Sequence, residues 1–283
     1  MSFSKRRILI LAAALAAGGV PGAAVFAAEI ERTGGPYVPT PQVVVDQMLR
    51  IGKVAAGDYV IDLGSGDGVI VLTAATQHKA SGVGVEIDPE LVALSNDRAK
   101  KLGVADRARF VREDVRKMDV SKATVVTLYL LPGMMIDLRP KLFAELKPGT
   151  RIVSHDYHFG DWQADDQFSF DVPEKEKVNG VPRATIYKWV VPAKVQGAWQ
   201  LRLAGGEQMP VSLQQKYQIL EGTATTGGRA VKLVGPTLSG EQIEFSLPVS
   251  GQLARFSGKV GAAQMEGTAE VPGRGTVRWT ATR

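Results

Sequence analysis

The feature that most constrains this chain is a glycine-rich segment between two apolar runs. Residues 59–63 read Y-V-I-D-L and predict a buried strand, and the apolar run that begins at Val69 predicts a helix. Between them, residues 64–68 read G-S-G-D-G. Glycines tolerate positive φ and let a ligand approach the backbone, and the start of a helix offers unpaired N–H groups. The segment therefore predicts a ligand site at the carboxyl end of a strand.

Strand-like and helix-like segments alternate from Gln42 to about Val191. This alternation predicts a doubly wound, Rossmann-like α/β sheet of parallel strands. Ligands of such sheets bind beyond the carboxyl ends of the strands, so the residues that follow each strand are the candidates for a site. Besides the first strand, we expect strands at residues 81–87, 108–111, 124–130 and 151–155, and helices at 69–78, 89–102 and 134–146.

The composition changes near residues 192–197. From there onward, short stretches alternate apolar and polar residues between Gly-rich turns, which predicts six or seven antiparallel strands with one apolar face. We expect a small antiparallel all-β domain, a sandwich or an open barrel, over residues 193–283, after a catalytic domain over residues 28–192. The β domain has neither His nor Asp, so we expect it to bind a partner rather than to catalyse a reaction.

The first residues are typical of a secretory signal peptide. A basic K-R-R at residues 5–7 precedes an uncharged run that ends in small residues, and a V-x-A pattern predicts cleavage after Ala27. An uncleaved anchor is the alternative, although glycines and Pro21 break the second half of the run. We expect residues 1–27 to be removed and the mature protein, without a stable membrane span, to reach a bacterial periplasm, with the twin-arginine route also open.

Charge and cysteine content narrow the classes of partner. The formal net charge is +5, but residues 1–27 contribute +3, residues 28–192 contribute −2 and residues 193–283 contribute +4. So small an excess of positive charge is usual for a solvated protein surface, and we expect no nucleic-acid partner. The chain has no cysteine, which excludes disulfides, thiolate metal sites and a cysteine nucleophile.

The acidic residue before the glycines narrows the class of ligand. A dinucleotide site normally shows G-x-G-x-x-G, whereas this chain has G-x-G-x-G after Asp62. A carboxylate at that position would repel a pyrophosphate and attract an ammonium group. A zwitterion such as the amino-acid end of S-adenosylmethionine therefore suits the segment, and a tight turn without a ligand is the alternative.

Two further predicted strands are followed by carboxylates. Glu86 ends the second strand, where it can accept hydrogen bonds from both hydroxyls of a ribose, or else cap the next helix. Asp114 follows the third strand, where it can accept a hydrogen bond from an adenine amino group, although acidic residues commonly end strands. Together with Asp62, these carboxylates indicate an adenosyl ligand.

In order and spacing, these residues resemble the class I S-adenosylmethionine-dependent methyltransferases over roughly residues 37–160. The specific matches are D-L-G-S-G-D-G, which begins at Asp62, and G-V-E-I-D-P, which contains Glu86. Within that class the sequence is most similar to the ATP synthase c-subunit lysine N-methyltransferase family and its bacterial exported relatives. This narrower resemblance rests on P-Y-V-P-T-P at 36–41, Y-L-L-P at 129–132 and L-K-P-G-T-R-I-V-S at 146–154.

The resemblance implies a cofactor, a substrate and a set of site residues. The cofactor would be S-adenosylmethionine, and the substrate would be a lysine side chain of a protein. The predicted signal peptide and second domain depart from the c-subunit enzymes, so the target protein stays open. The implied cofactor site has Tyr37 as a lid, the glycine segment with Asp62, Gly64, Ser65 and Gly66 at the methionine end, Glu86 at the ribose, Ile87 at the adenine face and Asp114 at the adenine amino group.

Candidate catalytic groups follow the fourth and fifth predicted strands. Many amino-methylating members of the class carry Asn/Asp-Pro-Pro-aromatic after the fourth strand. Here Tyr129 stands in that place, either to hydrogen-bond the amine or as a buried strand aromatic. His155 or Asp156 could accept the proton of the amine, with a supporting polar role as the alternative. His158 is close by, but neighbouring residues of an extended segment point to different sides, so we expect no metal.

The leading hypothesis is an exported S-adenosylmethionine-dependent methyltransferase that acts on a protein lysine. The alternative is a non-catalytic module that binds an adenosyl ligand while its β domain recognises an envelope partner. The glycine spacing disfavours a nucleotide-dependent oxidoreductase. An enzyme of the first kind would mainly align the amine with the methyl group, and alignment can supply roughly 7–11 kcal/mol.

Overall fold

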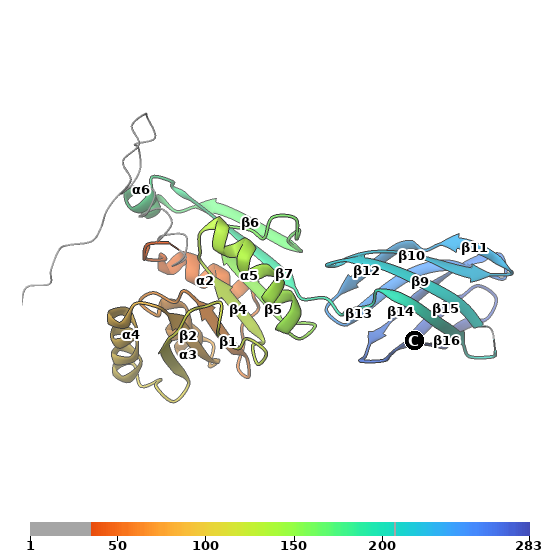
Figure 1. Cartoon of the computed structure of the whole chain (residues 1–283), viewed down its shortest axis with the longest axis horizontal. Coiled ribbons are helices and arrows are strands. Elements are labelled where there is room, and N and C mark those ends of the chain that lie inside the picture. Colours follow the sequence, from red (N-terminus) through yellow and green to blue (C-terminus); the bar gives the residue numbers. More distant parts are fainter. Residues whose placement is uncertain (1–34, 207) are drawn as a thin grey trace, which may run out of the picture. The chain divides into compact units, whose positions relative to one another are not determined.

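The computed structural model describes residues 35–206 and 208–283. The predicted signal peptide, residues 1–27, lies outside this part of the chain. The described residues form two compact units, one of residues 35–145 and Arg151–Trp189 and the other of Leu146–Thr150 and Val190–Arg283. Each unit has its own β-sheet (Figure 1).

A seven-stranded sheet forms the centre of the first unit, in the order β3-β2-β1-β4-β5-β7-β6. β1 pairs in parallel with β2 and β4, β2 with β3, and β4 with β5, which confirms the predicted Rossmann-like sheet. β6 and β7 pair antiparallel and extend it at one edge. The strands are β1 (Tyr59–Leu63), β2 (Ser81–Glu86), β3 (Ala108–Arg112), β4 (Val125–Leu128), β5 (Arg151–His155), β6 (Asp166–Asp171) and β7 (Arg183–Val190).

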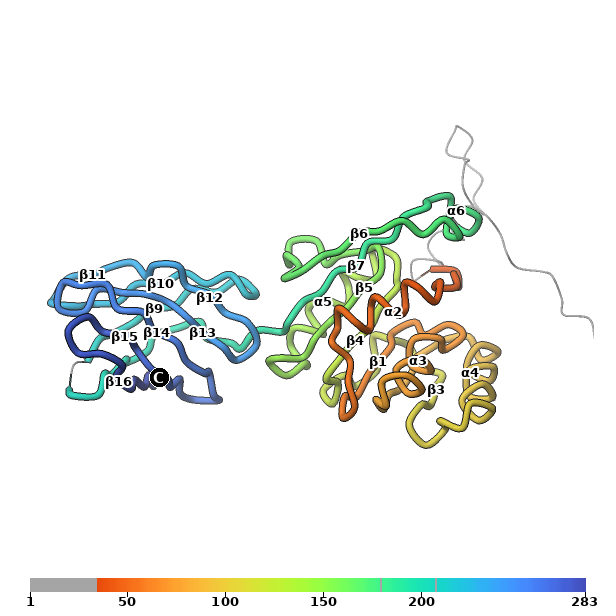
Figure 2. The backbone as a smooth tube through the Cα atoms, turned by 180° about the vertical axis from the view of Figure 1, so that it is seen from behind, coloured from red at the N-terminus to blue at the C-terminus, as the bar shows by residue number. Residues whose placement is uncertain are grey.

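Helices cover both faces of this sheet. α2 packs against α3 and β5, and α4 packs against β2 and β3, whereas α5 lies on the opposite face (Figures 1 and 2). A short helix, α6, connects β6 to β7. The helices span α2 (Gln42–Ile51), α3 (Val69–Gln77), α4 (Pro89–Lys101), α5 (Pro132–Glu145) and α6 (Pro173–Asn179).

Apolar spacing along α2 explains how this helix docks on the sheet. Val44, Val45, Met48 and Leu49 recur at helical spacing, and all four are fully buried in one core with residues of β1, β4, β5 and β7. Full burial of an aliphatic side chain of this size contributes about 1.5–3 kcal/mol. This core therefore fixes the sheet beneath α2 and α3 and holds the strand ends in register.

The register of β1 places the acidic residue of the glycine motif between two neighbouring strands. Asp62 pairs with Gly84 of β2 on one side and with Thr127 of β4 on the other. A side chain at position 84 would collide, because a Cβ there would lie 2.3 Å from the Phe110 ring and 2.6 Å from Ser65 Oγ. The glycine in β2 thus lets the motif loop pack against the sheet.

The second unit is one antiparallel sheet of nine strands, in the order β11-β10-β9-β8-β16-β15-β14-β13-β12. The sheet curls until β10 lies against β12 and β13, which makes a nearly closed barrel. The strands are β8 (Gly197–Leu203), β9 (Gln208–Lys216), β10 (Ile219–Thr226), β11 (Arg229–Lys232), β12 (Val234–Ser239), β13 (Gln242–Val249), β14 (Gln252–Val260), β15 (Gln264–Val271) and β16 (Gly275–Thr282).

Aromatic side chains fill the inside of this barrel. Trp199, Phe245, Phe256 and Trp279 are buried in one apolar core, and the Phe245 and Phe256 rings stack with centroids 4.9 Å apart. The predicted all-β class is confirmed, but the expected number of six or seven strands was too low. Two strands escaped the alternation pattern: β10, in which only Leu220 and Ala224 are buried, and β12, whose pairing is interrupted by a register shift.

Within the described residues, no helix is both long and apolar enough to cross a membrane. The same part of the chain holds no cluster of three or more His, Cys, Asp or Glu side chains with the geometry of a metal site.

Candidate functional site

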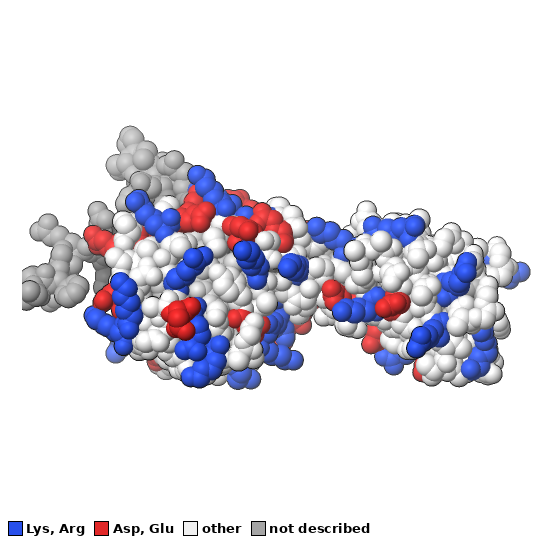
Figure 3. Space-filling view, turned by 90° about the horizontal axis from the view of Figure 1, so that it is seen from below, with Lys and Arg blue, Asp and Glu red and all other residues white. Residues whose placement is uncertain are grey.

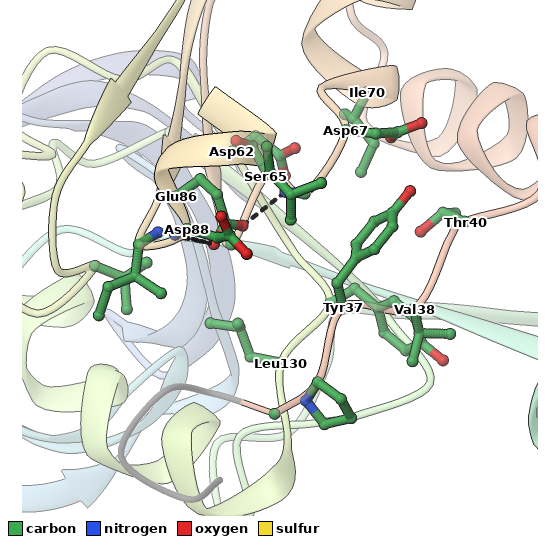
Figure 4. A pocket seen from close by; sticks show the side chains of 18 of the residues that line it. Tyr37, Val38, Thr40, Asp62, Ser65, Asp67, Ile70, Glu86, Asp88 and Leu130 are labelled. Carbon is green, nitrogen blue, oxygen red and sulfur yellow. Dashed lines mark hydrogen bonds between the residues drawn. The ribbon is translucent and has the colours of Figure 1, made fainter. Parts of the chain in front are cut away.

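A cavity of about 280 Å³ opens at the carboxyl ends of β1, β2 and β4 in the first unit (Figure 4). Its wall comes from the segment before α2, the glycine loop before α3, the ends of β2 and β3, and the turn after β4. All eight residues predicted to bind the cofactor line it: Tyr37, Asp62, Gly64, Ser65, Gly66, Glu86, Ile87 and Asp114.

Asp62 is a buried carboxylate in the cavity wall. Its side chain is 2% exposed, and its Oδ1 accepts a hydrogen bond of 2.7 Å from the Thr127 hydroxyl. The pKa of the Asp62 carboxyl is raised to about 7, chiefly by burial and also by the negative charges of Glu86 and Asp67, against the opposing hydrogen bond from Thr127. An ionised Asp62 therefore has no cationic partner in the described part of the chain, and a bound ligand could supply one.

Glu86 is held in place by three backbone amides. Its Oε2 accepts the Gly66 N–H at 2.9 Å, and its Oε1 accepts the amides of Ile87 and Asp88 at 2.8 and 3.0 Å (Figure 4). A carboxylate fixed in this way does not have to be ordered when a ligand binds. Its remaining lone pairs can accept hydroxyl protons, as predicted for a ribose diol.

The glycine loop offers fewer free amides than the sequence suggested. The N–H groups of Gly64 and Ser65 both donate to the Val85 carbonyl, at 2.9 and 3.0 Å, and that of Gly66 donates to Glu86. These amides serve the protein itself, so they are not available to bind a phosphate. The expectation of a loop with free N–H donors is wrong at these three positions.

Tyr37 packs against the glycine loop across the cavity from β4. A Cβ at Gly66, which has φ +53°, would lie 2.7 Å from the Tyr37 ring, so the close approach requires glycine there. The hydroxyl of Tyr37 points toward Asp67 in Figure 4. Burial and the Asp67 carboxylate raise the pKa of Tyr37 to about 12, so the phenol stays protonated. Its role as a lid stays a prediction.

Two arginines that sequence reasoning missed are bound to acidic residues of the wall. Arg116 donates three side-chain hydrogen bonds of 2.7–3.1 Å to the Asp114 carboxylate and holds the pKa of that carboxyl below its usual range. Arg98 of α4 donates hydrogen bonds to the backbone carbonyl of Asp67, at 2.7 Å, and to the Asp67 carboxylate, at 2.6 Å. Arg98 and Asp67 are 31 residues apart in the sequence, so no local sequence pattern predicted that they would pair. The predicted adenine contact of Asp114 stays a prediction.

The charge of the wall selects for a cationic ligand. The described lining residues include no Lys, Arg or His. Since carboxylates that face a cavity attract cations and repel phosphates, a sulfonium or ammonium ligand suits the cavity and a pyrophosphate does not. Six acidic residues line it: Asp62, Asp67, Glu86, Asp88, Glu113 and Asp114.

One hydroxyl in the wall is left unpaired by the residues that the structure describes. Ser65 is 6% exposed, and its Oγ has no hydrogen-bond partner among the described residues. Because buried polar atoms are normally satisfied, such an atom in a cavity wall indicates a polar ligand. With Asp62 and Glu86, it forms a set that fits the amino-acid and ribose groups of S-adenosylmethionine.

On the acceptor side, the structure brings one of the three predicted catalytic residues to the cavity. Tyr129 lines it, and the Tyr129 ring lies 4.0 Å from the His155 ring between centroids and 6.1 Å from the Tyr157 ring. His155 and Asp156 lie behind Tyr129 rather than in the wall, and both are bound to Lys175, at 3.0 and 2.5 Å.

The role of His155 and Asp156 as proton acceptors stays a prediction, and their contacts favour the supporting polar role instead. A base must reach the proton that it removes, and both groups already accept a hydrogen bond from the same ammonium group. The sequence gave no sign of Lys175, which stands in an E-K-E-K run of ordinary surface composition. It is nonetheless 2% exposed.

A family model and a similar protein identify the family to which this chain belongs. The model of the ANTKMT methyltransferase domain matches residues 62–166. A protein-lysine N-methyltransferase of Saccharolobus islandicus (strain REY15A) is 41% identical over 157 residues, which cover 55% of this chain and 93% of that protein. The chain belongs to the ANTKMT methyltransferase family. It is an S-adenosylmethionine-dependent methyltransferase.

Two further relatives of this methyltransferase each match about half of the chain. The ATP synthase c-subunit lysine N-methyltransferase of Xenopus laevis is 36% identical over 133 residues, 47% of this chain and 58% of that protein, so the match spans little more than half of it. The crystal structure of an RNA methyltransferase from Salinibacter ruber, solved with S-adenosyl-L-homocysteine, is 47% identical with a TM-score of 0.51 and covers 56% of this chain and 96% of that one.

Proposed function

We propose that this methyltransferase transfers the methyl group of S-adenosylmethionine to the ε-amino group of a lysine in a protein. The observation that carries the proposal is the acidic cavity wall, free of Lys, Arg and His among its described residues, with Tyr129 at its acceptor side. The matched lysine N-methyltransferases of an archaeon and a frog support the choice of acceptor.

The chemistry asks little of the protein beyond alignment and the exclusion of water. The cofactor supplies a methyl group on a positively charged sulfur; the nitrogen–carbon bond forms as the sulfur–carbon bond breaks, and the amine releases one proton to solvent. Asp62 and Glu86 would hold the cofactor in one orientation. Tyr129 would order the incoming amine, since a group held in line can gain several orders of magnitude in rate.

RNA is the competing acceptor, because the Salinibacter ruber relative is described as an RNA methyltransferase. Charge disfavours RNA here. Residues 28–192 carry a net charge of −2, and on the face drawn in Figure 3 the Lys and Arg side chains of the second unit are scattered between uncharged areas. Binding along a phosphate backbone needs a continuous basic surface.

The acceptor is tested with residues 28–283 and methyl-labelled S-adenosylmethionine. The labelled cofactor is incubated with envelope proteins, with total RNA and with lipid, and labelled protein is hydrolysed to amino acids. We expect methylated lysine, and no label when Asp62→Asn replaces the wild type. Asp119→Asn, which alters an exposed carboxylate away from the cavity, is the matched control and should retain activity.

Label in RNA, with none in lysine, would contradict the proposed acceptor. S-adenosylmethionine binding without transfer to protein, RNA or lipid would favour the alternative, a non-catalytic binding module. A calorimetric titration with S-adenosyl-L-homocysteine and with NAD shows which ligand occupies the cavity, whichever acceptor is found.

We also propose that the protein is exported and acts on an envelope protein that the β domain helps to recognise. The support is the basic, apolar and small-residue order of residues 1–27 and the absence of His and Asp from residues 193–283. N-terminal sequencing of the protein purified from bacterial fractions tests export. We expect a periplasmic chain that begins at Ala28; an unprocessed chain found in the cytoplasm alone would contradict it.

A further inference from the structure

Lys175 is a buried charged group for which methyl transfer has no direct use. It lies on α6 and is 2% exposed, while the residues on either side of it are exposed. Its ammonium nitrogen lies 3.0 Å from His155 Nε2, 2.5 Å from Asp156 Oδ2 and 2.8 Å from the Arg183 carbonyl oxygen. An ammonium group has three protons, so these three acceptors account for all of them.

This arrangement fixes the tautomer of His155. Since an ammonium group can only donate, Nε2 of His155 must accept, and the proton of the neutral ring lies on Nδ1. His155 is 1% exposed. The pKa of its ring is lowered to about 4, chiefly by burial and also by the charge of Lys175, while the neighbouring Asp156 carboxylate opposes both. The ring therefore stays neutral throughout the physiological range of pH.

The same ammonium group also braces an unusual turn where the chain leaves β5. Asp156 has φ +62°, a conformation that is uncommon for residues other than glycine. Its N–H donates to the Thr185 carbonyl at 2.7 Å, its Oδ1 accepts the Thr185 N–H at 3.0 Å, and its Oδ2 accepts from Lys175. Such conformations persist when the surroundings hold them, and here β7 and α6 do so.

From this turn, contacts continue to the cavity wall. The His155 ring lies against the Tyr129 ring, with centroids 4.0 Å apart and planes at 31°. Tyr129 lines the cavity together with Asp62 and Met134. A shift of His155 would therefore remove the support of the ring that faces the acceptor side.

We propose that Lys175 is a positioning residue: it holds His155 and the turn at Asp156, and His155 in turn holds the Tyr129 ring where the acceptor amine approaches. The inference rests on the proposed methyl transfer to lysine. A buried ion pair with no link to the cavity would affect only stability, so the two roles can be separated by experiment.

The first test compares Lys175→Met with Lys177→Met, an exposed lysine of the same helix. For Lys175→Met we expect kcat to fall roughly tenfold to hundredfold, the range in which small misplacements of reacting groups reduce rates. The affinity for S-adenosyl-L-homocysteine should stay within about twofold, because Lys175 lies outside the cavity wall. Lys177→Met should leave both unchanged.

Because removal of one partner leaves Asp156 without its counter-ion, Lys175→Met could fail to fold. The double variant Lys175→Met/Asp156→Asn removes both charges together and provides a folded protein for the same measurements. Its kcat should also be reduced, with S-adenosyl-L-homocysteine binding retained. In a Tyr129→Leu background, Lys175→Met should lower kcat much less than in the wild type, because neighbours that act through one contact are not additive.

The second test needs no substrate. The chain has 3 histidines, so nitrogen NMR can follow each ring. We expect wild-type His155 to stay neutral with its proton on Nδ1 from about pH 5.5 to 8, well above its lowered pKa. In the Lys175 variants we expect a tautomer mixture or a titration within that range.

Three outcomes are distinguishable. A folded Lys175 variant with wild-type kcat would overturn the inference, and so would an unchanged His155 tautomer. An inactive wild type would overturn the proposed function and this inference together, whereas an active wild type with either of the first two results would overturn the inference alone.

Discussion

The backbone amide of Gly66 donates to Oε2 of Glu86 at 2.9 Å. This bond joins the glycine loop after β1 to the carboxylate at the end of β2, so two parts of the cofactor site that are 20 residues apart are held as one unit. The Glu86 carboxylate also accepts the amides of Ile87 and Asp88. Its first task is therefore to shape the loop, and its free lone pairs remain for the ligand.

Replacement of Glu86 should weaken cofactor binding and loosen this loop. Glu86→Gln keeps the size of the side chain but removes its charge and turns one acceptor into a donor that faces an N–H. Hydrogen bonds to charged groups contribute about 1.5–3 kcal/mol, so we expect roughly a tenfold to hundredfold loss of S-adenosyl-L-homocysteine affinity by calorimetry. Glu90→Gln, an exposed residue of α4, is the control and should bind normally.

The raised pKa of Asp62 predicts opposite effects of pH on binding and on the stability of the free protein. Its pKa is about 7 in the folded protein and near 4 in an unfolded chain. From about pH 4 to 7 the folded state thus holds more protons, so the free energy of unfolding falls as pH rises through this window. A cationic ligand favours the ionised carboxylate, so affinity should rise over the upper part of the same window.

Melting temperatures test the predicted fall in stability, and S-adenosyl-L-homocysteine titrations test the predicted rise in affinity, both between about pH 5.5 and 8. Binding at about pH 6 should release a proton, which calorimetry in two buffers detects. Asp62→Asn cannot titrate and should remove most of both pH dependences. Equal affinity of the wild type at the two ends of this range would contradict the assignment.

The close approach of Tyr37 to the loop predicts a specific effect at Gly66. Gly66→Ala places a methyl group 2.7 Å from the Tyr37 ring at a residue with φ +53°, so the ring must move. We expect a loss of stability of about 1 kcal/mol or more and a clear loss of cofactor affinity. Gly57→Ala is a matched control, because its φ is +93° but nothing lies within 4 Å. It should lose stability and keep its affinity.

The β domain should be open to disruption without loss of the cofactor site. Trp279 is 1% exposed, packs edge-on against Phe245 and Phe256, and donates from Nε1 to the Ser257 and Thr268 carbonyls at 3.1 Å. Trp279→Ala should cost the second unit about 3–5 kcal/mol. Calorimetry should show one melting transition lowered, while S-adenosyl-L-homocysteine binding stays intact. Thr280→Ala, on the exposed face of β16, should change neither.

The predictions of the fold that were confirmed rest on local sequence patterns. The parallel core of the first unit follows from strand and helix periodicities that each segment contains in full, and the β class of the second follows from its alternation and turns. β6 was missed because only Phe168 and Phe170 alternate with polar residues in it, and none of its six residues is buried. β7 was missed with it, although Ala184, Ile186 and Trp189 are buried along this strand.

The candidate site likewise has a part that the sequence predicted and a part that it did not. Asp62, Glu86 and the glycines were found because the turn and the strand ends place them at one edge of the sheet, whatever the rest of the chain does. His155 and Asp156 were placed on the correct strand end, but the group that binds both of them was not predicted. Their partner, Lys175, is 19 or 20 residues away on a helix that no pattern separates from ordinary surface.

The sequence by itself determined that a parallel sheet ends in a glycine loop flanked by carboxylates, because strand, turn and helix preferences act between near neighbours. Only the tertiary structure decided which charges meet. It joined Arg98 to Asp67, Arg116 to Asp114 and Lys175 to Asp156, and among the described residues it gave Asp62 no counter-ion. The reason is physical: an ion pair or a buried carboxylate depends on distance and solvent access, which packing sets once distant segments have come together.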